Sequence, residues 1–212
     1  MRIFAIELSS RLGSIALVED GHVVDEKRWE ETFKNRQQLF DAMASLESDW
    51  DDIDIFAVGR GPGAFSGMRI GFSVVNSLAA PGVKPVHALN SGASIAAQSG
   101  ADRTAVVGDA RRNKVWAGVF VGTELEKEFE LMEVDKLKEF IPDGALVASP
   151  DYDRLADLLS EFKTGVMTEP VFPSAGTLGQ LVHERLEKGV LSEPFEPLYM
   201  HPPVFIAPRF PA

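Results

Sequence analysis

The stretch VGRGPGAFSGMRI, residues 58–70, places a glycine-rich loop directly before an expected helix. Loops of this kind often hold phosphate groups at the helix N-terminus. A Walker A loop would need a lysine after its last glycine, but Met68 follows Gly67. A Rossmann fingerprint would need an acidic residue about 20 residues later, and none occurs before Asp102. Neither nucleotide-binding motif is complete.

The same glycines have a second use, which is close packing. Gly67 and Gly71 lie one turn apart on the expected helix, and each glycine inside a helix costs about 1 kcal/mol relative to alanine. We expect Ser66 to cap this helix, which continues to Ala79. The small-residue stripe either packs on the protein's own sheet or receives the helices of another chain. The sequence leaves both interpretations open.

Charge and composition limit the function classes. The chain has 212 residues, a formal net charge of −11 and no cysteine. Phosphate backbones need a basic surface, so stand-alone binding of nucleic acid is disfavoured. The lack of cysteine excludes disulfides and thiolate chemistry. No apolar run reaches the length of a membrane span and no signal-peptide cleavage region is evident, so we expect a cytoplasmic protein with no membrane contact.

The acidic residues are unevenly distributed. None occurs from Ile55 to Ala101, where the basic residues are Arg60, Arg69 and Lys84. Such an island is either a docking surface or a buried centre, where charge of any kind is rare.

The order of the expected elements predicts the fold. Three strands come first, with the Asp20-Gly21 pair as a hairpin turn, and then helix, strand, helix and strand follow up to residue 89. The second half repeats three strands and then alternating helices and strands, ending in a helix opened by Ser174 or Thr177. We therefore predict an α/β fold of two stacked lobes, residues 1–98 and 99–212, as in actin-like ATPases and sugar kinases. The proline-rich tail is expected to be extended.

Candidate catalytic groups are incomplete. His183-Glu184 begins a zinc-protease motif, but Glu187 stands where the second histidine is required, so we expect no metal. Asp109 resembles the base of a sugar kinase, but the following turn, Arg111–Lys114, has no glycine to hold a phosphate. That turn either contacts an anion or is simply solvated. A small-molecule kinase or ATPase remains the alternative function.

Four stretches resemble the TsaB (YeaZ) family: GRGPGAFSGMRIGFSVVNSLA, MRIFAIELSSRLGSIAL, GDARRNKVWAGVF and EPLYM. The resemblance implies a two-lobed actin-like (ribonuclease H-like) fold with a degenerate nucleotide site, no cofactor and no catalytic residue. It implies an accessory subunit for making threonylcarbamoyladenosine on tRNA, with a catalytic TsaD-type subunit and a TsaE-type ATPase as partners. The tRNA would be reached only through the complex. Relatives are also called glycoprotease-like.

The resemblance also implies a partner interface on the first two helices, about Arg36–Glu47 and Ser66–Ala79, which would form a homodimer when the partner is missing. The chain departs from the family at Glu7, where aspartate is usual, and we expect the longer side chain to displace that carboxylate. The expected interface residues are Arg36, Leu39, Phe40, Met43, Phe65, Gly67, Met68, Ile70, Gly71, Val74 and Val75. The expected structural loop contains Gly61, Pro62, Gly63 and Ser66, and the candidate anion contacts are Arg60, Arg69, Arg111 and Arg112.

Overall fold

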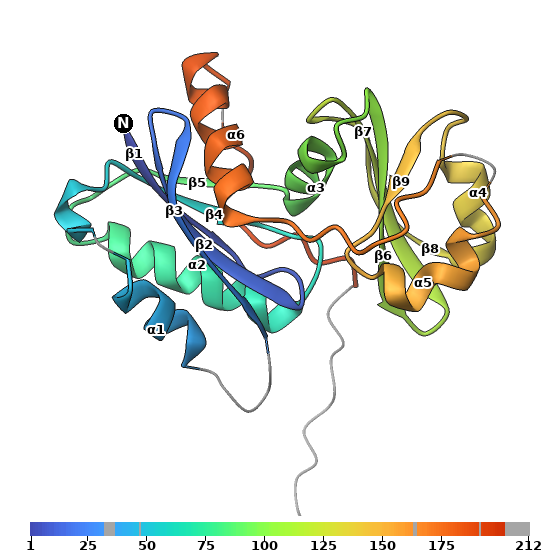
Figure 1. Cartoon of the computed structure of the whole chain (residues 1–212), viewed down its shortest axis with the longest axis horizontal. Coiled ribbons are helices and arrows are strands. Elements are labelled where there is room, and N and C mark those ends of the chain that lie inside the picture. Colours follow the sequence, from blue (N-terminus) through green and yellow to red (C-terminus); the bar gives the residue numbers. More distant parts are fainter. Residues whose placement is uncertain (32–36, 47, 163–164, 191, 202–212) are drawn as a thin grey trace, which may run out of the picture.

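The computed structural model describes residues 1–31, 37–46, 48–162, 165–190 and 192–201, which form two α/β lobes side by side (Figure 1). The first sheet has the order β3-β2-β1-β4-β5 and the second the order β8-β7-β6-β9. The strands are β1 (Arg2–Glu7), β2 (Leu12–Glu19), β3 (His22–Glu30), β4 (Ile55–Gly59), β5 (Val86–Leu89), β6 (Arg103–Arg111), β7 (Lys114–Val121), β8 (Glu124–Glu133) and β9 (Leu146–Ala148).

Both sheets are built in the same way. Three antiparallel strands are followed by a parallel partner of the first one, so β4 pairs with β1 and β9 pairs with β6. The hairpin between β2 and β3 turns at Asp20 and Gly21, which both have positive φ. The predicted two-lobed fold is therefore confirmed.

Helices cover both faces of the first sheet (Figure 1). The helices are α1 (Gln38–Ala44), α2 (Phe65–Ala79), α3 (Ser91–Ser99), α4 (Leu137–Phe140), α5 (Tyr152–Leu159) and α6 (Ala175–Glu187), with short 3-10 turns η1 (Trp50–Asp52) and η2 (Val134–Lys136). Helices α1 and α2 pack against Phe4, Ile6 and Phe56 on one face. Helix α6 packs against Ile3 and Ala5 on the other face. Because both faces are covered, β1 and β4 are apolar runs with little alternation.

The sequence patterns missed α3, which lies between the lobes (Figure 1). Its apolar cluster includes Ile95 from the helix and Phe120 from β7, so one core crosses both lobes. A side chain at Gly92 would lie only 2.5 Å from Phe129 Cζ, and glycine therefore permits this close approach. The helix consists mainly of small residues with weak hydrophobic periodicity. Both of its ends carry typical capping residues: the Asn90 side chain accepts from Ala93 N–H, and Gly100 adopts a left-handed conformation.

Several boundaries differ from the predictions. Helix α1 ends at Ala44, and Trp50 begins η1, whose first turn is capped by the Asp49 carboxylate. The N-cap of α2 is Ala64, so the prediction of Ser66 as the cap is wrong. The cap at Ser174 is confirmed, because its hydroxyl accepts from Thr177 N–H.

The lobes do not separate cleanly in sequence. The two sheets fall on either side of residue 98, but α6 packs on β1 and β2. The described part of the tail also returns to the first lobe, where Glu193 pairs with Ala88 of β5. Within the described ranges no helix has the length and apolar character of a membrane span.

Candidate functional site

The glycine stripe of α2 faces the protein's own sheet. A side chain at Gly67 would collide with the Leu8 carbonyl oxygen, and one at Gly71 would lie 3.2 Å from Val58 Cγ2. These positions allow α2 to cross the ends of β1 and β4 at close range. The expectation that Gly67 and Gly71 present a flat surface to another chain is therefore wrong. The space beside each glycine, where a side chain would lie, is already occupied by Leu8 or Val58 of the same chain.

Some of the other expected interface residues are also internal. Leu39, Met68 and Val75 are buried, so they belong to the core of the first lobe rather than to its surface. Met43 and Val74 are half-buried. Arg36 lies outside the described residues.

Three large apolar side chains of these helices remain open to solvent. Phe40 on α1 is 60% exposed, and Phe65 and Ile70 on α2 are 55% and 48% exposed. The two helices lie side by side on the same face of the sheet (Figure 1). We call Phe40, Phe65 and Ile70 the docking face. Large apolar side chains left exposed on neighbouring helices are candidates for an interaction surface.

The glycine-rich loop is held by its own protein. Ala64 N–H donates to the Ser9 carbonyl at 2.6 Å, and a side chain at Gly63 would collide with that oxygen. Gly61 and Pro62 are buried, and the Gly61 N–H donates to Ser91 Oγ at 3.0 Å. The loop therefore packs on the turn between β1 and β2 and on the start of α3.

Glu7 is turned into the core. Its carboxylate is fully buried and accepts from Ser9 N–H at 2.7 Å and from the Ser91 hydroxyl at 2.6 Å. Gly59 makes room for it, since a side chain there would collide with Oε2. Burial raises the pKa of Glu7 above its usual value, although these hydrogen bonds oppose the shift. The side chain therefore links the end of β1 to the start of α3.

Arg60 is not a free cation. It is almost buried, pairs with Glu193 at 3.3 Å and donates through Nε to the Glu196 carbonyl at 3.0 Å, so its assignment as an anion contact is wrong. Arg69 is exposed beside the docking face and its guanidinium lies 5.3 Å from the centre of the Phe65 ring.

The remaining two expected anion contacts lie in the second lobe. Arg111 and Arg112 form the turn between β6 and β7 with positive φ, and both are exposed. Arg111 pairs with Asp109 at 3.0 Å. A contact between this turn and an anion stays a prediction.

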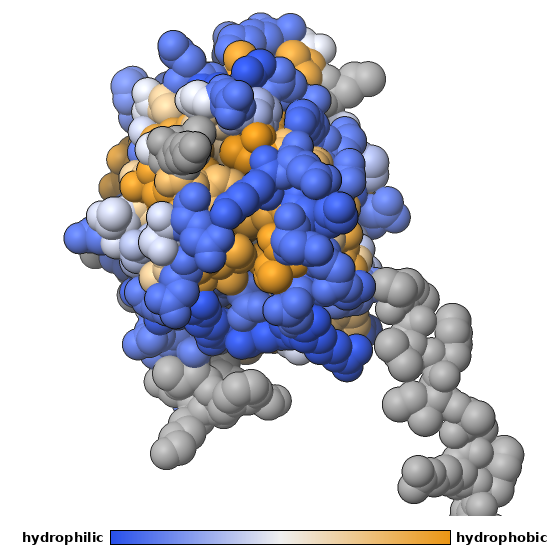
Figure 2. Space-filling view, turned by 90° about the vertical axis from the view of Figure 1, so that its right-hand side faces the viewer, coloured by the Kyte–Doolittle hydropathy of each residue, from blue (hydrophilic) through white to orange (hydrophobic). Residues whose placement is uncertain are grey.

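Other polar groups in the second lobe form a local network. Asp151 accepts from Asp109 N–H at 3.0 Å, and burial raises the pKa of Asp151. Arg154 lies 3.5 Å from Asp151 and 3.8 Å from Asp109, which balances their charge. No group of three or more histidine or acidic residues is arranged to hold a metal in the described part of the chain. The end of this lobe is mainly hydrophilic, with apolar areas between the polar side chains (Figure 2).

Comparison with known proteins connects these observations. The family model described as "TsaD: tRNA N6-adenosine threonylcarbamoyltransferase" matches residues 37–179. The chain belongs to this family.

Curated proteins similar to this chain are named as TsaB proteins of tRNA threonylcarbamoyladenosine biosynthesis. The TsaB protein of Escherichia coli is 31% identical over 141 residues, which are 59% of this chain and 61% of that protein. TsaB of Bacillus subtilis is 30% identical over 127 residues, 57% of this chain and 55% of that protein. Each match thus spans less than two thirds of the relative's length.

Solved structures show the fold. YeaZ from Pseudomonas aeruginosa superposes with a TM-score of 0.76 at 24% identity, covering 93% of this chain and 99% of that chain. Another P. aeruginosa protein, described as similar to the peptidase YeaZ, has a TM-score of 0.81 at 23% identity and covers 94% and 99%. The activator of 2-hydroxyisocaproyl-CoA dehydratase from Clostridium difficile, solved with ADPNP, has a TM-score of 0.52 at 8% identity and covers 89% and 97%. The two-lobed actin-like fold is common to all three.

Proposed function

We propose that this chain is a TsaB-type accessory subunit in the synthesis of threonylcarbamoyladenosine on tRNA. It docks a TsaD-type catalytic subunit through the docking face and does not itself transform a substrate. The observation that carries the proposal is the exposure of Phe40, Phe65 and Ile70 on two adjacent helices. The names of the curated relatives supply the pathway.

The energetic argument for docking rests on these side chains. Burying a large apolar side chain completely stabilises a complex by about 1.5–3 kcal/mol. Each residue of the docking face is still about half exposed and can therefore contribute about half of that value. A few such anchors commonly dominate an interface.

Other parts of the proposal follow from the family. A TsaE-type ATPase completes the set of proteins, and tRNA is reached through the complex rather than by this acidic chain alone. Without the catalytic partner, the same face pairs two copies of the chain, since an exposed apolar face can satisfy itself by two-fold symmetry. The protein needs no cofactor for this role and acts in the cytoplasm.

Reconstitution tests the proposal. Threonylcarbamoyl transfer to tRNA is measured with TsaD- and TsaE-type proteins, with and without this chain, and with Ile70→Asp or Val121→Asp. Val121 is a matched control, because it is 49% exposed but lies in the second lobe. We expect activity to require the chain, to fall with Ile70→Asp and to persist with Val121→Asp. Equal activity of the two variants would contradict docking at this face.

A second measurement addresses the alternative function. Calorimetry of the isolated chain with ATP and magnesium should show no micromolar binding. Such binding would favour a small-molecule kinase or ATPase and would contradict the accessory role.

A further inference from the structure

Residues 192–200, which we call the strap, are fastened along the first lobe by backbone and side-chain hydrogen bonds. Ala88 N–H of β5 donates to Ser192 Oγ at 3.2 Å, and Glu193 forms an antiparallel bridge with Ala88. Further on, Leu198 N–H donates to the Arg60 carbonyl at 2.7 Å. The strap therefore follows the edge of β5 and then the glycine-rich loop that leads into α2.

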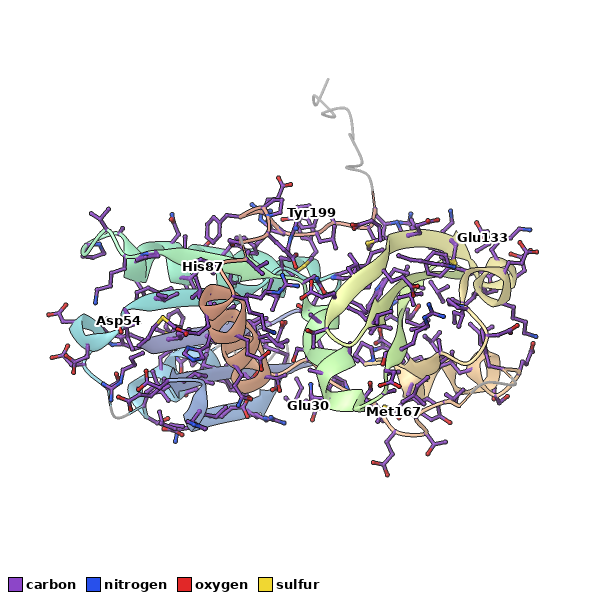
Figure 3. All side chains as sticks on the ribbon, turned by 90° about the horizontal axis from the view of Figure 1, so that it is seen from above. Glu30, Asp54, His87, Glu133, Met167 and Tyr199 are labelled. Carbon is purple, nitrogen blue, oxygen red and sulfur yellow. The ribbon has the colours of Figure 1, made fainter. Side chains whose placement is uncertain are left out.

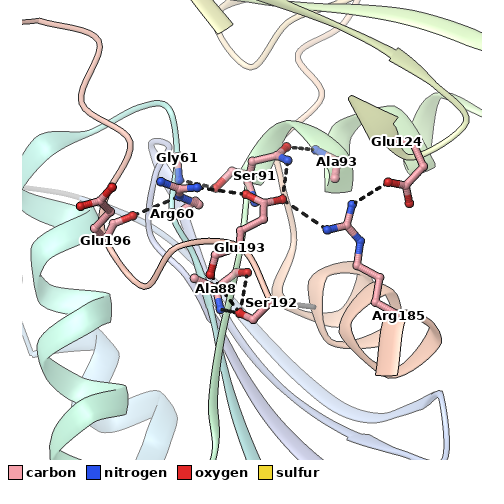
Figure 4. Close-up of polar contacts among 11 residues, drawn as sticks. Arg60, Gly61, Ala88, Ser91, Ala93, Glu124, Arg185, Ser192, Glu193 and Glu196 are labelled. Carbon is pink, nitrogen blue, oxygen red and sulfur yellow. Dashed lines mark hydrogen bonds and ion pairs between the residues drawn. The ribbon is translucent and has the colours of Figure 1, made fainter. Parts of the chain in front are cut away.

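Glu193 anchors this course (Figure 4). Its Oε1 accepts from Asn90 Nδ2 at 2.8 Å and lies 3.4 Å from Arg185, while its Oε2 accepts from Asn90 N–H at 3.1 Å and lies 3.3 Å from Arg60. All of these side chains are largely screened from solvent. Charge-assisted hydrogen bonds in such a setting are stronger than those at an open surface. One carboxylate thus ties the strap to the N-cap of α3, to α6 and to the loop before α2.

The same anchor reaches the second lobe. Arg185 also pairs with Glu124 of β8 at 3.2 Å, and Asn90 caps α3 between the lobes. Tyr199 lies where the strap passes from the first lobe toward the second (Figure 3). The position of the strap is therefore fixed from both lobes.

Two aromatic side chains of the strap lie on α2. The ring of Phe195 is 4.8 Å from that of Phe72, and the ring of Tyr199 is 4.8 Å from that of Phe65, measured between centroids. Phe65 belongs to the docking face, and Tyr199 is still 43% exposed. A partner that covers the open side of Phe65 therefore meets Tyr199 as well.

We infer that the strap is the second half of the docking face, with Tyr199 as an anchor and Glu193 as its positioning residue. The inference rests on the proposed function and names the same TsaD-type subunit as the occupant. Arg69 is the only charged residue of α2, and it lies beside Phe65. The complementary partner surface is accordingly apolar, with a carboxylate placed opposite Arg69.

The test uses the full chain with the purified TsaD-type subunit. Dissociation constants are measured for Tyr199→Ala, Glu193→Gln and Glu196→Gln, together with hydrogen exchange of residues 192–200 in the free chain. Glu196 is the matched control, because its side chain is exposed and its backbone carbonyl makes the contact with Arg60. We expect Tyr199→Ala to weaken binding about tenfold, in proportion to its open aromatic surface. Glu193→Gln should weaken binding and speed exchange in the strap, and Glu196→Gln should do neither.

The outcomes separate this inference from the proposed function. Normal binding by Tyr199→Ala, when Ile70→Asp binds weakly, would overturn the strap inference and leave docking by α2 intact. Normal binding by both would overturn docking itself. If hydrogen exchange of residues 192–200 is unchanged in Glu193→Gln, the positioning role of Glu193 is overturned. Thermal unfolding of each variant shows whether weak binding reflects a loss of folding.

Discussion

Gly67→Ala should destabilise the protein, which is opposite to the usual effect of this substitution in a helix. At an exposed helical site the change stabilises by up to about 1 kcal/mol, because alanine is the better helix former. Here the new methyl group would collide with the Leu8 carbonyl oxygen, a backbone atom that cannot rotate away. Overpacking of this kind costs about 1–3 kcal/mol. After subtracting the propensity gain, we expect a net loss of up to about 2 kcal/mol.

Two substitutions in the same helix serve as controls. At Gly71 the nearest atom is a Val58 methyl carbon 3.2 Å away, which can move slightly, so Gly71→Ala should be milder than Gly67→Ala. Ser77 is exposed in the same helix, and Ser77→Ala should stabilise by about 0.5 kcal/mol. The assay is urea unfolding followed by circular dichroism. A Gly67→Ala protein as stable as the native chain, or more stable, would refute the inward packing of the glycine stripe.

Three further predictions follow from single contacts. Burial holds the pKa of Glu7 above 4.5, so the folded protein keeps a proton that the unfolded chain loses, and the ionisation of Glu7 lowers stability as pH rises from 4.5 to the raised pKa. The unfolding free energy of the native chain minus that of Glu7→Gln should therefore fall across this pH window. A difference that stays constant with pH would contradict the prediction. Ser174→Ala should lose about 1 kcal/mol in urea unfolding, because the Ser174 hydroxyl caps α6. Ser66→Ala should change stability by less than about 0.5 kcal/mol, because Ser66 is not the N-cap of α2. Phe65→Ala should weaken binding to the TsaD-type subunit in calorimetry about 4- to 13-fold, from about half of a buried aromatic's contribution, and unchanged affinity would exclude Phe65 from the interface.

The fold was largely predictable because its signals are local. The turn at Asp20-Gly21, the apolar runs of β1 and β4 and the repeated element order all come from short-range chemistry. Helix α3 was missed, since its small residues match the tight space against Phe120 and Phe129, which is a tertiary property. Its caps at Asn90 and Gly100 were the available signal.

The candidate site was less predictable. A pair of glycines one turn apart indicates close approach, but not whether the approaching backbone belongs to the same chain. The structure assigns it to Leu8, so docking now depends on Phe40, Phe65 and Ile70 instead. The segment without acidic residues did not indicate that Arg60 forms an ion pair with Glu193, because the two residues are far apart in sequence. The packing of the strap on the first lobe was not predicted for the same reason.

The docking face itself can be tested directly, because the chain has no cysteine. Single cysteines are placed at Ile70 and at Val121, and the rate of maleimide labelling is measured by mass spectrometry with and without the TsaD-type subunit. We expect the partner to slow labelling at position 70 strongly and to leave position 121 unchanged, since only the former lies on the docking face. Equal labelling at position 70 with and without a bound partner would contradict the account.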